Sequence, residues 1–451
     1  MLEFVTSQKG TRKLVVNGSL FNKQSDGSED KELWRCERRT CKARIHTRAN
    51  TIVMEVGLHN HVVTHGQVEV ERARSNMKRR AETTEESTRS IVQNELLTVP
   101  VDVAHLLPKR PTLSRDVRRH RQMGGTSDQQ DMSVYSLTKS NQPFIRVNRE
   151  NMIIFAADDD LEFLAGCEHW FADGTFRVAP NGFEQLYTIH GFVNNEVFPA
   201  IYALLSERTE QAYEQLLHEI LLLHAGLDPV SVLFDFELAA IRAFQSTFPG
   251  TTITGCMFHF GQCIWRKLQS EGLSERYRDE PEFALLVKRL LALAFIPTDD
   301  VMRVFEILTG DPAYRQIEVI CDYMKDNFIG RQRRGRRGQP RFAIQLWNQY
   351  SRVIDNLPRS NNSLEGWHNA FNNVVGFAHP SIAKLARKLQ QEQHSMQIHR
   401  RQLALGTITG KKKKIYARIN EALHTIAVDY SNRDPITYLG DIARVLNINV
   451  T

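Results

Sequence analysis

Three acidic residues lie in sequence settings that could bind divalent metal ions. Asp173 is followed by Gly-Thr-Phe, Asp235 by Phe-Glu, and Glu365 by Gly-Trp-His. Both aspartates end short apolar runs, and a carboxylate at the end of a buried strand projects from the sheet edge at a fixed position. Three carboxylates converging there could hold two Mg²⁺ ions about 4 Å apart and align an oxygen nucleophile with a phosphodiester. The alternative is that each is an ordinary acidic residue, one of 52, that ends a strand or caps a helix.

The apolar patterning around these acids predicts the elements that must position them. Strands are expected at Met152-Ile-Ile-Phe-Ala, at Trp170-Phe-Ala, twice within Phe183 to Ser206, at Val230 to Phe234 and at Thr251 to Thr254. Helical spacing is found from Glu210 to Leu223 and from Glu237 to Phe248. Counted from Trp170-Phe-Ala, the predicted order is therefore three strands, a helix, a strand, a helix and a strand, which indicates the α/β class.

Four ordered segments resemble the Mutator-like element (MULE) transposases. They are Asp173-Gly-Thr-Phe with the strands up to Ser206, Asp235-Phe-Glu-Leu-Ala-Ala-Ile-Arg-Ala-Phe, Gly255-Cys-Met-Phe-His-Phe-Gly-Gln-Cys-Ile-Trp-Arg-Lys, and Asn361-Asn-Ser-Leu-Glu-Gly-Trp-His-Asn-Ala-Phe. The resemblance implies an RNase H-like core in which Asp173, Asp235 and Glu365 bind catalytic Mg²⁺ or Mn²⁺. It also implies cleavage and joining of phosphodiesters in double-stranded DNA, at the terminal inverted repeats of an element.

The N-terminal segment carries a second set of metal-binding residue types. Two cysteines and two histidines follow the spacing Cys-x4-Cys-x17-His-x-His, at Cys36, Cys41, His59 and His61. Two thiolates and two imidazoles make a tetrahedral set that suits Zn²⁺. The segments between them alternate like short strands, and so small a piece buries little surface, so a metal could supply folding free energy of order 10 kcal/mol. The alternative is a chance grouping of two thiols and two surface histidines.

Aromatic residues in this segment add a family resemblance. Phe4, Phe21 and Trp34 precede the four ligand-type residues in the order of the FLYWCH zinc finger, with Phe21 where that family has a tyrosine. The departure loses a hydroxyl group but keeps an aromatic core residue. The resemblance implies that Cys36, Cys41, His59 and His61 are zinc ligands.

Two groups of basic residues could contact DNA phosphates. Those near the cysteines are Arg35, Arg38, Arg39, Lys42 and Arg44, and no acidic residue interrupts the stretch from Arg38 to Arg48. Those in a later glycine-containing run are Arg331, Arg333, Arg334, Arg336 and Arg337. The later run also has the composition of a nuclear import signal, from which we expect a nuclear protein. The alternative for both groups is a solvated face or loop.

Three further residues are candidates for an accessory role in the core. Cys256 and His259 form a Cys-x2-His pair that could bind a metal ion or contact a strained DNA end. The equally weighted alternative is a buried thiol and a hydrogen-bonded histidine. His368 follows Glu365 by three residues and could organise the metal site without being a ligand.

Composition sets outer bounds on the class of protein. At 451 residues the chain can form two or three domains, and its net charge of +6 with a pI near 8.9 is only mildly basic. No apolar run of 18 residues and no leader pattern are present in the sequence, which argues against membrane insertion or secretion. Six cysteines, two of them in zinc-like spacing, fit a reducing compartment better than a disulfide framework.

We expect six segments along the chain. They are a FLYWCH-type zinc finger at 1–66, a basic helical linker or DNA-binding arm at 67–149, the first part of the RNase H-like core at 150–263, an all-helical insertion at 264–358, the last part of the core at 359–400, and a C-terminal helical tail at 401–451. In the linker, Thr83 to Leu97 and the stretch after Pro108 predict two basic helices, a helix-turn-helix-like arm or an inert connection. From residue 415 on, one helix and an apolar tail are expected.

These patterns together predict a DNA transposase, or a host protein derived from one, that binds DNA through a zinc finger and cuts it with divalent ions. The rival is a non-catalytic DNA-binding regulator in which the fold survives as a scaffold. A nuclease acting on RNA hybrids would suit the core but not the zinc finger. Motifs leave catalysis open, because it depends on sub-ångström placement, and they leave a homo-oligomer open as well.

Overall fold

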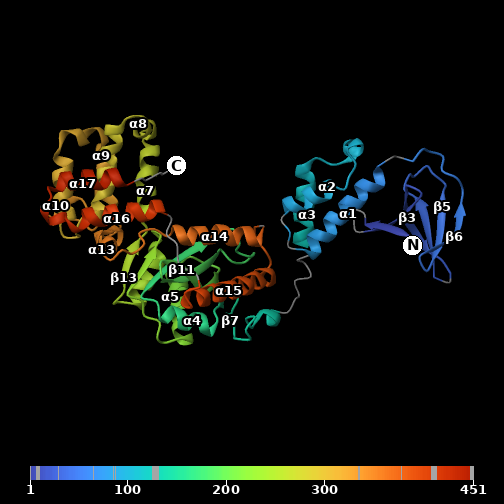
Figure 1. The fold of residues 1–451 in the computed structure, drawn as a ribbon, viewed down its shortest axis with the longest axis horizontal. Helices are drawn as coiled ribbons and strands as arrows, with labels where there is room; N and C mark the ends of the chain where they lie inside the picture. Colours follow the sequence, from blue (N-terminus) through green and yellow to red (C-terminus); the bar gives the residue numbers. More distant parts are fainter. Residues whose placement is uncertain are drawn as a thin grey trace. The chain divides into compact units, whose positions relative to one another are not determined.

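The computed structural model describes residues 2–6, 11–28, 30–63, 66–84, 86, 88–123, 132–333, 336–376, 378–407 and 414–446. The chain divides into two compact units, Met1–Gln130 and Asp131–Thr451, coloured by sequence in Figure 1. Within the described ranges, no helix combines the length and apolar character needed to cross a bilayer.

The first unit begins with a six-stranded antiparallel sheet whose strands pair in chain order. The strands are β1 (Glu3–Thr6), β2 (Arg12–Val16), β3 (Ser19–Asp26), β4 (Lys31–Cys36), β5 (Arg44–Arg48) and β6 (Thr51–Val56). Asn17 and Gly18 both have positive φ between β2 and β3, as a two-residue type I′ hairpin requires. Leu14, Phe21 and Trp34 are buried on one face of the sheet.

Among the described residues of this unit, the sheet is followed by the α-helices α1 (Gln67–Thr83), α2 (Thr88–Leu96) and α3 (Arg110–Met123). They pack around Met77, Ile91 and Leu113. The sequence predicted helices in the regions of α2 and α3 but missed α1, because arginines interrupt the apolar residues that recur along its buried face. Helix α1 also contacts the sheet, since Val68 packs against Val5 of β1.

The second unit is built on a seven-stranded sheet with the order β13-β12-β9-β10-β11-β8-β7. Its strands are β7 (Ile145–Asn148), β8 (Met152–Phe155), β9 (His169–Thr175), β10 (Gln185–Val193), β11 (Glu196–Leu205), β12 (Ser231–Phe234) and β13 (Thr252–Gly255). Strands β9, β10 and β11 are antiparallel neighbours, and β12 runs parallel to both β9 and β13. The helices between them follow the predicted order, with α5 (Glu210–Leu223) before β12 and α6 (Leu238–Thr247) before β13.

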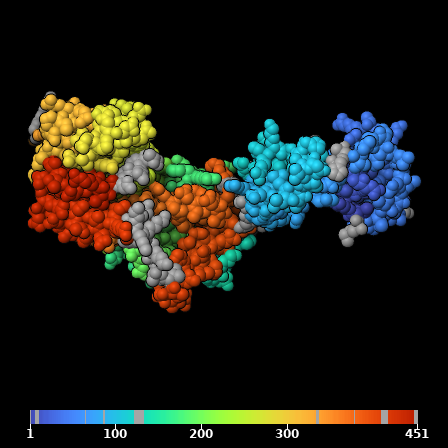
Figure 2. All heavy atoms as spheres, turned by 45° about the horizontal axis from the view of Figure 1, so that its top comes forward, coloured from blue at the N-terminus to red at the C-terminus, as the bar shows by residue number. Residues whose placement is uncertain are grey.

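Helices cover both faces of this sheet. On one face α4 (Asp158–Ala165), α5 and α6 enclose the larger core, which includes Trp170. On the other face α14 (Asn362–Val375) and α15 (Ile382–Ala404) bury Tyr202 and Phe371. Figure 2 shows the surface of these two helices in orange. The break between α14 and α15 contains Pro380, as the sequence predicted.

The stretch between the sheet and α14 is mainly helical, as predicted. Its helices are α7 (Met257–Ser270), α8 (Ser274–Asp279), α9 (Pro281–Ala292), α10 (Val301–Gly310), α11 (Glu318–Met324), α12 (Ile344–Trp347) and α13 (Tyr350–Ile354). The exception is a short two-stranded pairing of β14 (Gln332–Arg333) with β15 (Arg336–Arg337), so the insertion is not all-helical.

The C-terminal region differs from the sequence prediction of one helix and an apolar tail. It forms α16 (Lys414–Val428) and α17 (Pro435–Val445), beside α9 and α10 in Figure 1. The side chain of Asp434 accepts a hydrogen bond from the Thr437 N–H and Pro435 occupies the first turn, so a new helix starts there. Leu423 and Tyr438 are buried in the same core as the insertion helices. Helices α16 and α17 therefore pack against the insertion and do not form an extended tail.

Candidate zinc site and acidic site

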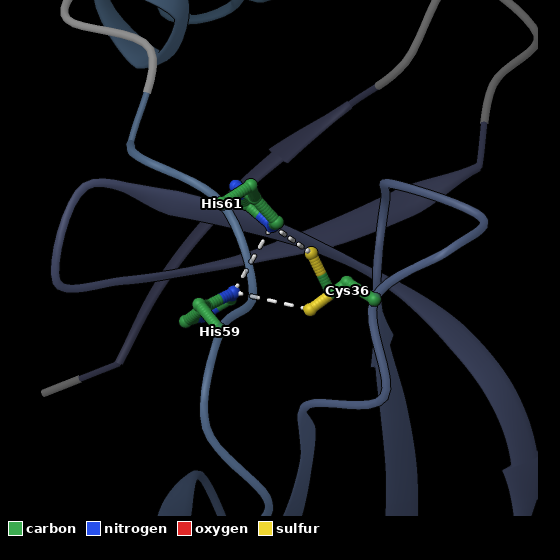
Figure 3. A group of neighbouring side chains, drawn as sticks. Cys36, His59 and His61 are labelled. Atoms are coloured by element: carbon green, nitrogen blue, oxygen red, sulfur yellow. Dashed lines mark hydrogen bonds between the residues drawn. The ribbon is translucent and has the colours of Figure 1, made fainter.

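The four predicted zinc ligands converge in the first unit. Cys36 ends β4, Cys41 lies in the turn before β5, and His59 and His61 lie in the segment after β6 (Figure 3). The Cys36 Sγ atom is 3.3 Å from His61 Nε2, and Cys41 Sγ is 3.5 Å from His59 Nδ1. The His59 Nδ1 and His61 Nε2 atoms are 3.2 Å apart, and all four ligand atoms lie within 4.8 Å of one another. The predicted convergence is confirmed.

These distances fit a zinc ion. A tetrahedral Zn²⁺ with bonds of about 2.0–2.3 Å separates its ligand atoms by roughly 3.3–3.8 Å. Burial by itself raises the pKa of the Cys41 thiol, but hydrogen bonds from the Ala43 and Asn60 N–H groups, together with Cys36 and His59, lower it to about 6. Burial raises the pKa of Cys36. The Cys41 sulfur can thus bind as a thiolate, and a bound cation would favour ionisation of the Cys36 thiol.

Two aromatic residues pack near the four ligand-type residues. The Phe21 ring meets the His59 ring edge-on, with ring centroids 5.5 Å apart. The indole N–H of Trp34 donates to Thr47 Oγ1 over 2.9 Å, both groups being buried. The phenylalanine that replaces the family's tyrosine therefore orients a ligand through ring packing, for which no hydroxyl group is needed.

The basic residues near the zinc ligands fall into two groups. Arg35, Arg38, Arg39 and Lys42 are exposed around the two cysteines. Arg44 is half-buried, and its Nη1 atom donates to the carbonyl oxygens of Cys41 and Ala43. Arg44 therefore fixes the turn that carries Cys41, whereas the other four side chains are exposed to solvent.

The later arginine run is partly neutralised by acids that lie outside it. Arg331 pairs with Asp326 and Asp322, and Arg337 pairs with Glu306. Arg336 is exposed. The side chain of Arg333 and the whole of Arg334 lie outside the described residues. Local composition suggested an acid-free loop, but helices α10 and α11 bring carboxylates to it.

The predicted catalytic acids sit on adjacent elements of the second unit. Asp173 lies inside β9, which continues to Thr175, so the expectation that it ends the strand is wrong. Asp235 directly follows β12, the parallel neighbour of β9. Glu365 lies in the first turn of α14. The strand continues past Asp173 because Asp173, Gly174 and Thr175 pair with Thr188, Tyr187 and Leu186 of β10.

Asp173 is held by a set of donors in a largely buried position. Its Oδ1 atom accepts from the Gly174 N–H over 2.8 Å, and its Oδ2 atom accepts from Asn361 Nδ2 over 3.2 Å. Burial, followed by the charges of Asp235 and Glu365, raises the pKa of Asp173 to about 8. Asn361 belongs to the motif that carries Glu365, but its contact with Asp173 was not predicted.

The second aspartate has its own neighbours. Burial and then the Glu237 charge raise the pKa of Asp235 to about 6. Glu237 itself accepts from Arg208 Nε over 3.0 Å and from the Tyr213 hydroxyl over 2.8 Å. Within the described part of the chain, only the Cys36–Cys41–His59–His61 group brings three or more ligand atoms within 4.8 Å. The charges of Asp235 and Glu365 act on Asp173.

The three accessory candidates each have a polar partner. The Cys256 thiol is buried and donates to Asn361 Oδ1 over 3.0 Å, and His259 Nε2 is 3.6 Å from Glu365 Oε1. His368 Nδ1 is 3.8 Å from Asp173 Oδ2. Burial lowers the pKa of His368 to about 4, so this ring is neutral at physiological pH. Cys256 and His259 thus contact different groups rather than a common ligand position.

A buried polar chain continues from His368 into the sheet. Thr188 Oγ1 lies 3.2 Å from His368 Nε2 and 2.9 Å from His190 Nε2. Burial holds the pKa of His190 well below its usual value. Neither Thr188 nor His190 was predicted as a site residue, because a threonine and a histidine in an apolar strand do not indicate a partner on a helix that is distant in the sequence.

Two family models match parts of the chain. Residues 4–61 match the FLYWCH zinc finger domain, and residues 169–262 match the MULE transposase domain. The second match contains Asp173, Asp235, Cys256 and His259, and it ends before Glu365. No curated protein matches the chain. Both resemblances read from the motifs are confirmed: the chain carries one segment similar to the FLYWCH zinc finger domain and a later one similar to the MULE transposase domain.

Proposed function

We propose that this protein is a DNA transposase, or a protein derived from one, that cleaves and joins DNA phosphodiesters at Asp173, Asp235 and Glu365. The observation that carries the proposal is the placement of the acids: Asp173 lies on β9, Asp235 directly follows its parallel neighbour β12, and Glu365 lies in the first turn of α14. Burial, followed by the charges of Asp235 and Glu365, raises the pKa of Asp173. Folding alone gains nothing from gathering like charges, so such a group is typical of a functional site.

The sheet order supports an RNase H-like core. Strand β9 is an interior strand: β10 and β11 follow it as an antiparallel meander on one side, and parallel β12 and β13 lie on the other. Asp173 on β9, Asp235 after β12 and Glu365 on a helix beyond a long insertion have the order that the MULE resemblance implies. Topology and acid placement thus agree with one proposal.

The donor chemistry fits Mg²⁺ or Mn²⁺, which prefer carboxylate oxygens. Divalent ions bound there would lower the pKa of an attacking hydroxyl group and stabilise the leaving oxygen. The protein's own part is orientation: Gly174 and Asn361 fix the two oxygens of Asp173, and the Glu237 N–H fixes Asp235 Oδ1 over 3.2 Å. Burial of these groups limits their reorganisation during the reaction.

The zinc finger is proposed to bind double-stranded DNA at terminal inverted repeats. Support comes from Arg35, Arg38, Arg39 and Lys42, which are exposed around the zinc ligands and can neutralise phosphates. Arg336 of the later arginine run is a further exposed cation that could bind DNA or act in nuclear import. A nuclear location follows from the proposed substrate and is tested by imaging a tagged protein.

A strand-cleavage assay tests the function. Full-length protein is incubated with Mg²⁺ or Mn²⁺ and DNA carrying terminal inverted repeats, and nicked or joined products are resolved on a denaturing gel. Asp173→Asn should abolish the products, and Asp228→Asn, an exposed acid before β12, should not change them. If the wild type binds DNA sequence-specifically but does not cleave it, the proposed catalytic activity is wrong. The protein is then a non-catalytic DNA-binding regulator.

A further inference from the structure

The Cys-x2-His pair at the start of α7 lies at a structural junction. The Cys256 N–H donates to the carbonyl oxygen of Phe234, the residue before Asp235, over 2.7 Å. The next residue, Met257, donates its N–H to the carbonyl oxygen of Arg359 over 2.8 Å. This junction therefore joins the end of β12 to the segment that leads into α14, and it lies between the elements that carry Asp235 and Glu365.

Asn361 links Cys256 to Asp173. Asn361 is fully buried, its Oδ1 atom accepts from the Cys256 thiol over 3.0 Å, and its own N–H donates to Cys256 Sγ over 3.4 Å. Its Nδ2 atom donates to Asp173 Oδ2 over 3.2 Å. The reverse amide orientation would turn a carbonyl oxygen toward the carboxylate, so the thiol proton selects the orientation in which Asn361 can donate to Asp173.

His259, one turn further along α7, faces the third acid. Its Nε2 atom lies 3.6 Å from Glu365 Oε1. Its Nδ1 atom is buried and has no hydrogen-bond partner among the described residues. A neutral His259 ring with its proton on Nε2 presents a donor to Glu365. The unpartnered Nδ1 atom then carries a lone pair, and burying a lone pair without a partner costs less free energy than burying an unpartnered N–H group in the same place.

We propose that Cys256 and His259 are positioning residues for the acidic site, Cys256 acting on Asp173 through Asn361 and His259 acting on Glu365. This inference rests on the proposed function, because it assigns these residues to the same carboxylates. It differs from a metal-ligand role: the Cys256 thiol is directed at an amide oxygen, and His259 is directed at a different side chain. Helix α7 thereby couples two acids from distant parts of the chain.

Metal affinity of the full-length, zinc-loaded protein tests the proposal. Mn²⁺ binding is measured by electron paramagnetic resonance for the wild type, Cys256→Ala, Cys256→Ser and the matched control Cys321→Ala, a buried thiol on α11. Loss of a group that orients a metal ligand weakens binding by roughly 10–100-fold. We expect that loss for Cys256→Ala and no change for Cys321→Ala. Cys256→Ser retains a hydroxyl donor and should recover most of the affinity.

A pair of His259 variants tests the second part of the proposal, the effect of His259 on Glu365. His259→Gln keeps an N–H donor that can reach Glu365, and His259→Ala removes it, so only the alanine variant should weaken Mn²⁺ binding. Wild-type affinity in both alanine variants would overturn the positioning roles and leave the proposed function standing. A wild type that binds no Mn²⁺, and whose Asp173→Asn variant behaves identically, would overturn the proposed function and this inference with it.

Discussion

Asn361 Nδ2 donates to Asp173 Oδ2 over 3.2 Å across a sequence separation of 188 residues. The contact joins the interior strand β9 to the segment that begins α14. It makes the geometry of one acid depend on the same segment that carries another, Glu365. Changes at either place therefore have measurable effects at the other.

The buried charge of Asp173 makes stability depend on pH. Its pKa is raised to about 8, so between the unfolded pKa near 4 and about 8 the folded state holds a proton that the unfolded chain has lost. Stability should thus fall as pH rises through this window. In buffer free of divalent ions, Asp173→Asn should raise the free energy of unfolding at pH 8 by on the order of a few kcal/mol and change it little at pH 4.

Thermal melts at the two pH values measure this effect. The control is Asp228→Asn, whose exposed carboxylate should leave both melting temperatures close to wild type. A destabilised Asp173→Asn variant at pH 8 would contradict the prediction, because it would mean that the ionised carboxylate stabilises the ion-free fold.

Gly174 is expected to tolerate no side chain. A Cβ atom there would collide with Oε1 of Gln185, a fully buried residue whose Nε2 atom donates to Tyr213. Gly174→Ala should therefore destabilise the second unit by about 1–3 kcal/mol in urea unfolding. Gly366→Ala meets open space in α14 and should be neutral or stabilising by up to about 1 kcal/mol. Equal stability of the two variants would show that Gln185 moves aside without cost.

A buried ion pair should hold α15 to α4. Arg400 on α15 contacts Asp160 on α4, which is 1% exposed. Burial raises the pKa of Asp160 in spite of this partner. Arg400→Ala would leave the carboxylate without its main cation and should cost about 3–5 kcal/mol. Exposed Arg401 provides the matched control, and calorimetry should detect a change only for Arg400→Ala.

Zinc should be required for the fold of the first unit. Cys41→Ser removes a fully buried sulfur ligand, and zinc content measured by atomic absorption should fall from about one ion per chain to near zero. Residues 4–61 should then become sensitive to protease, because metal binding supplies much of the folding free energy of such modules. Cys263→Ser changes a thiol in the other unit and should keep the zinc.

Arginines in the later run should differ in their effect on DNA binding. Arg336 is exposed, but Arg331 and Arg337 are paired with carboxylates. Arg336→Ala should weaken DNA binding and reduce the slope of log affinity against log salt by about one, the value for one lost phosphate contact. Arg337→Ala should reduce it less. Equal slopes for wild type and Arg336→Ala would exclude this residue from the interface.

The sequence by itself determined the local features of this protein. Four ligand-type residues at fixed spacing identified the zinc site, since strands this short leave few ways to arrange them around one ion. The apolar runs predicted the strands that carry or precede Asp173 and Asp235, and periodicity predicted that the insertion is mainly helical. Helix α1 and the second C-terminal helix, α17, were missed, because their apolar faces become evident only against the surfaces they cover.

Only the tertiary structure decided which distant groups meet. No spacing rule relates Asn361 to Asp173, or Thr188 to His368, because each contact depends on how α14 packs on the sheet. The same holds for Arg337, whose acidic partner Glu306 comes from α10. Local pattern reflects the short-range preferences of the backbone and the need to bury apolar faces, whereas pairing between elements is set by their packing across the whole core.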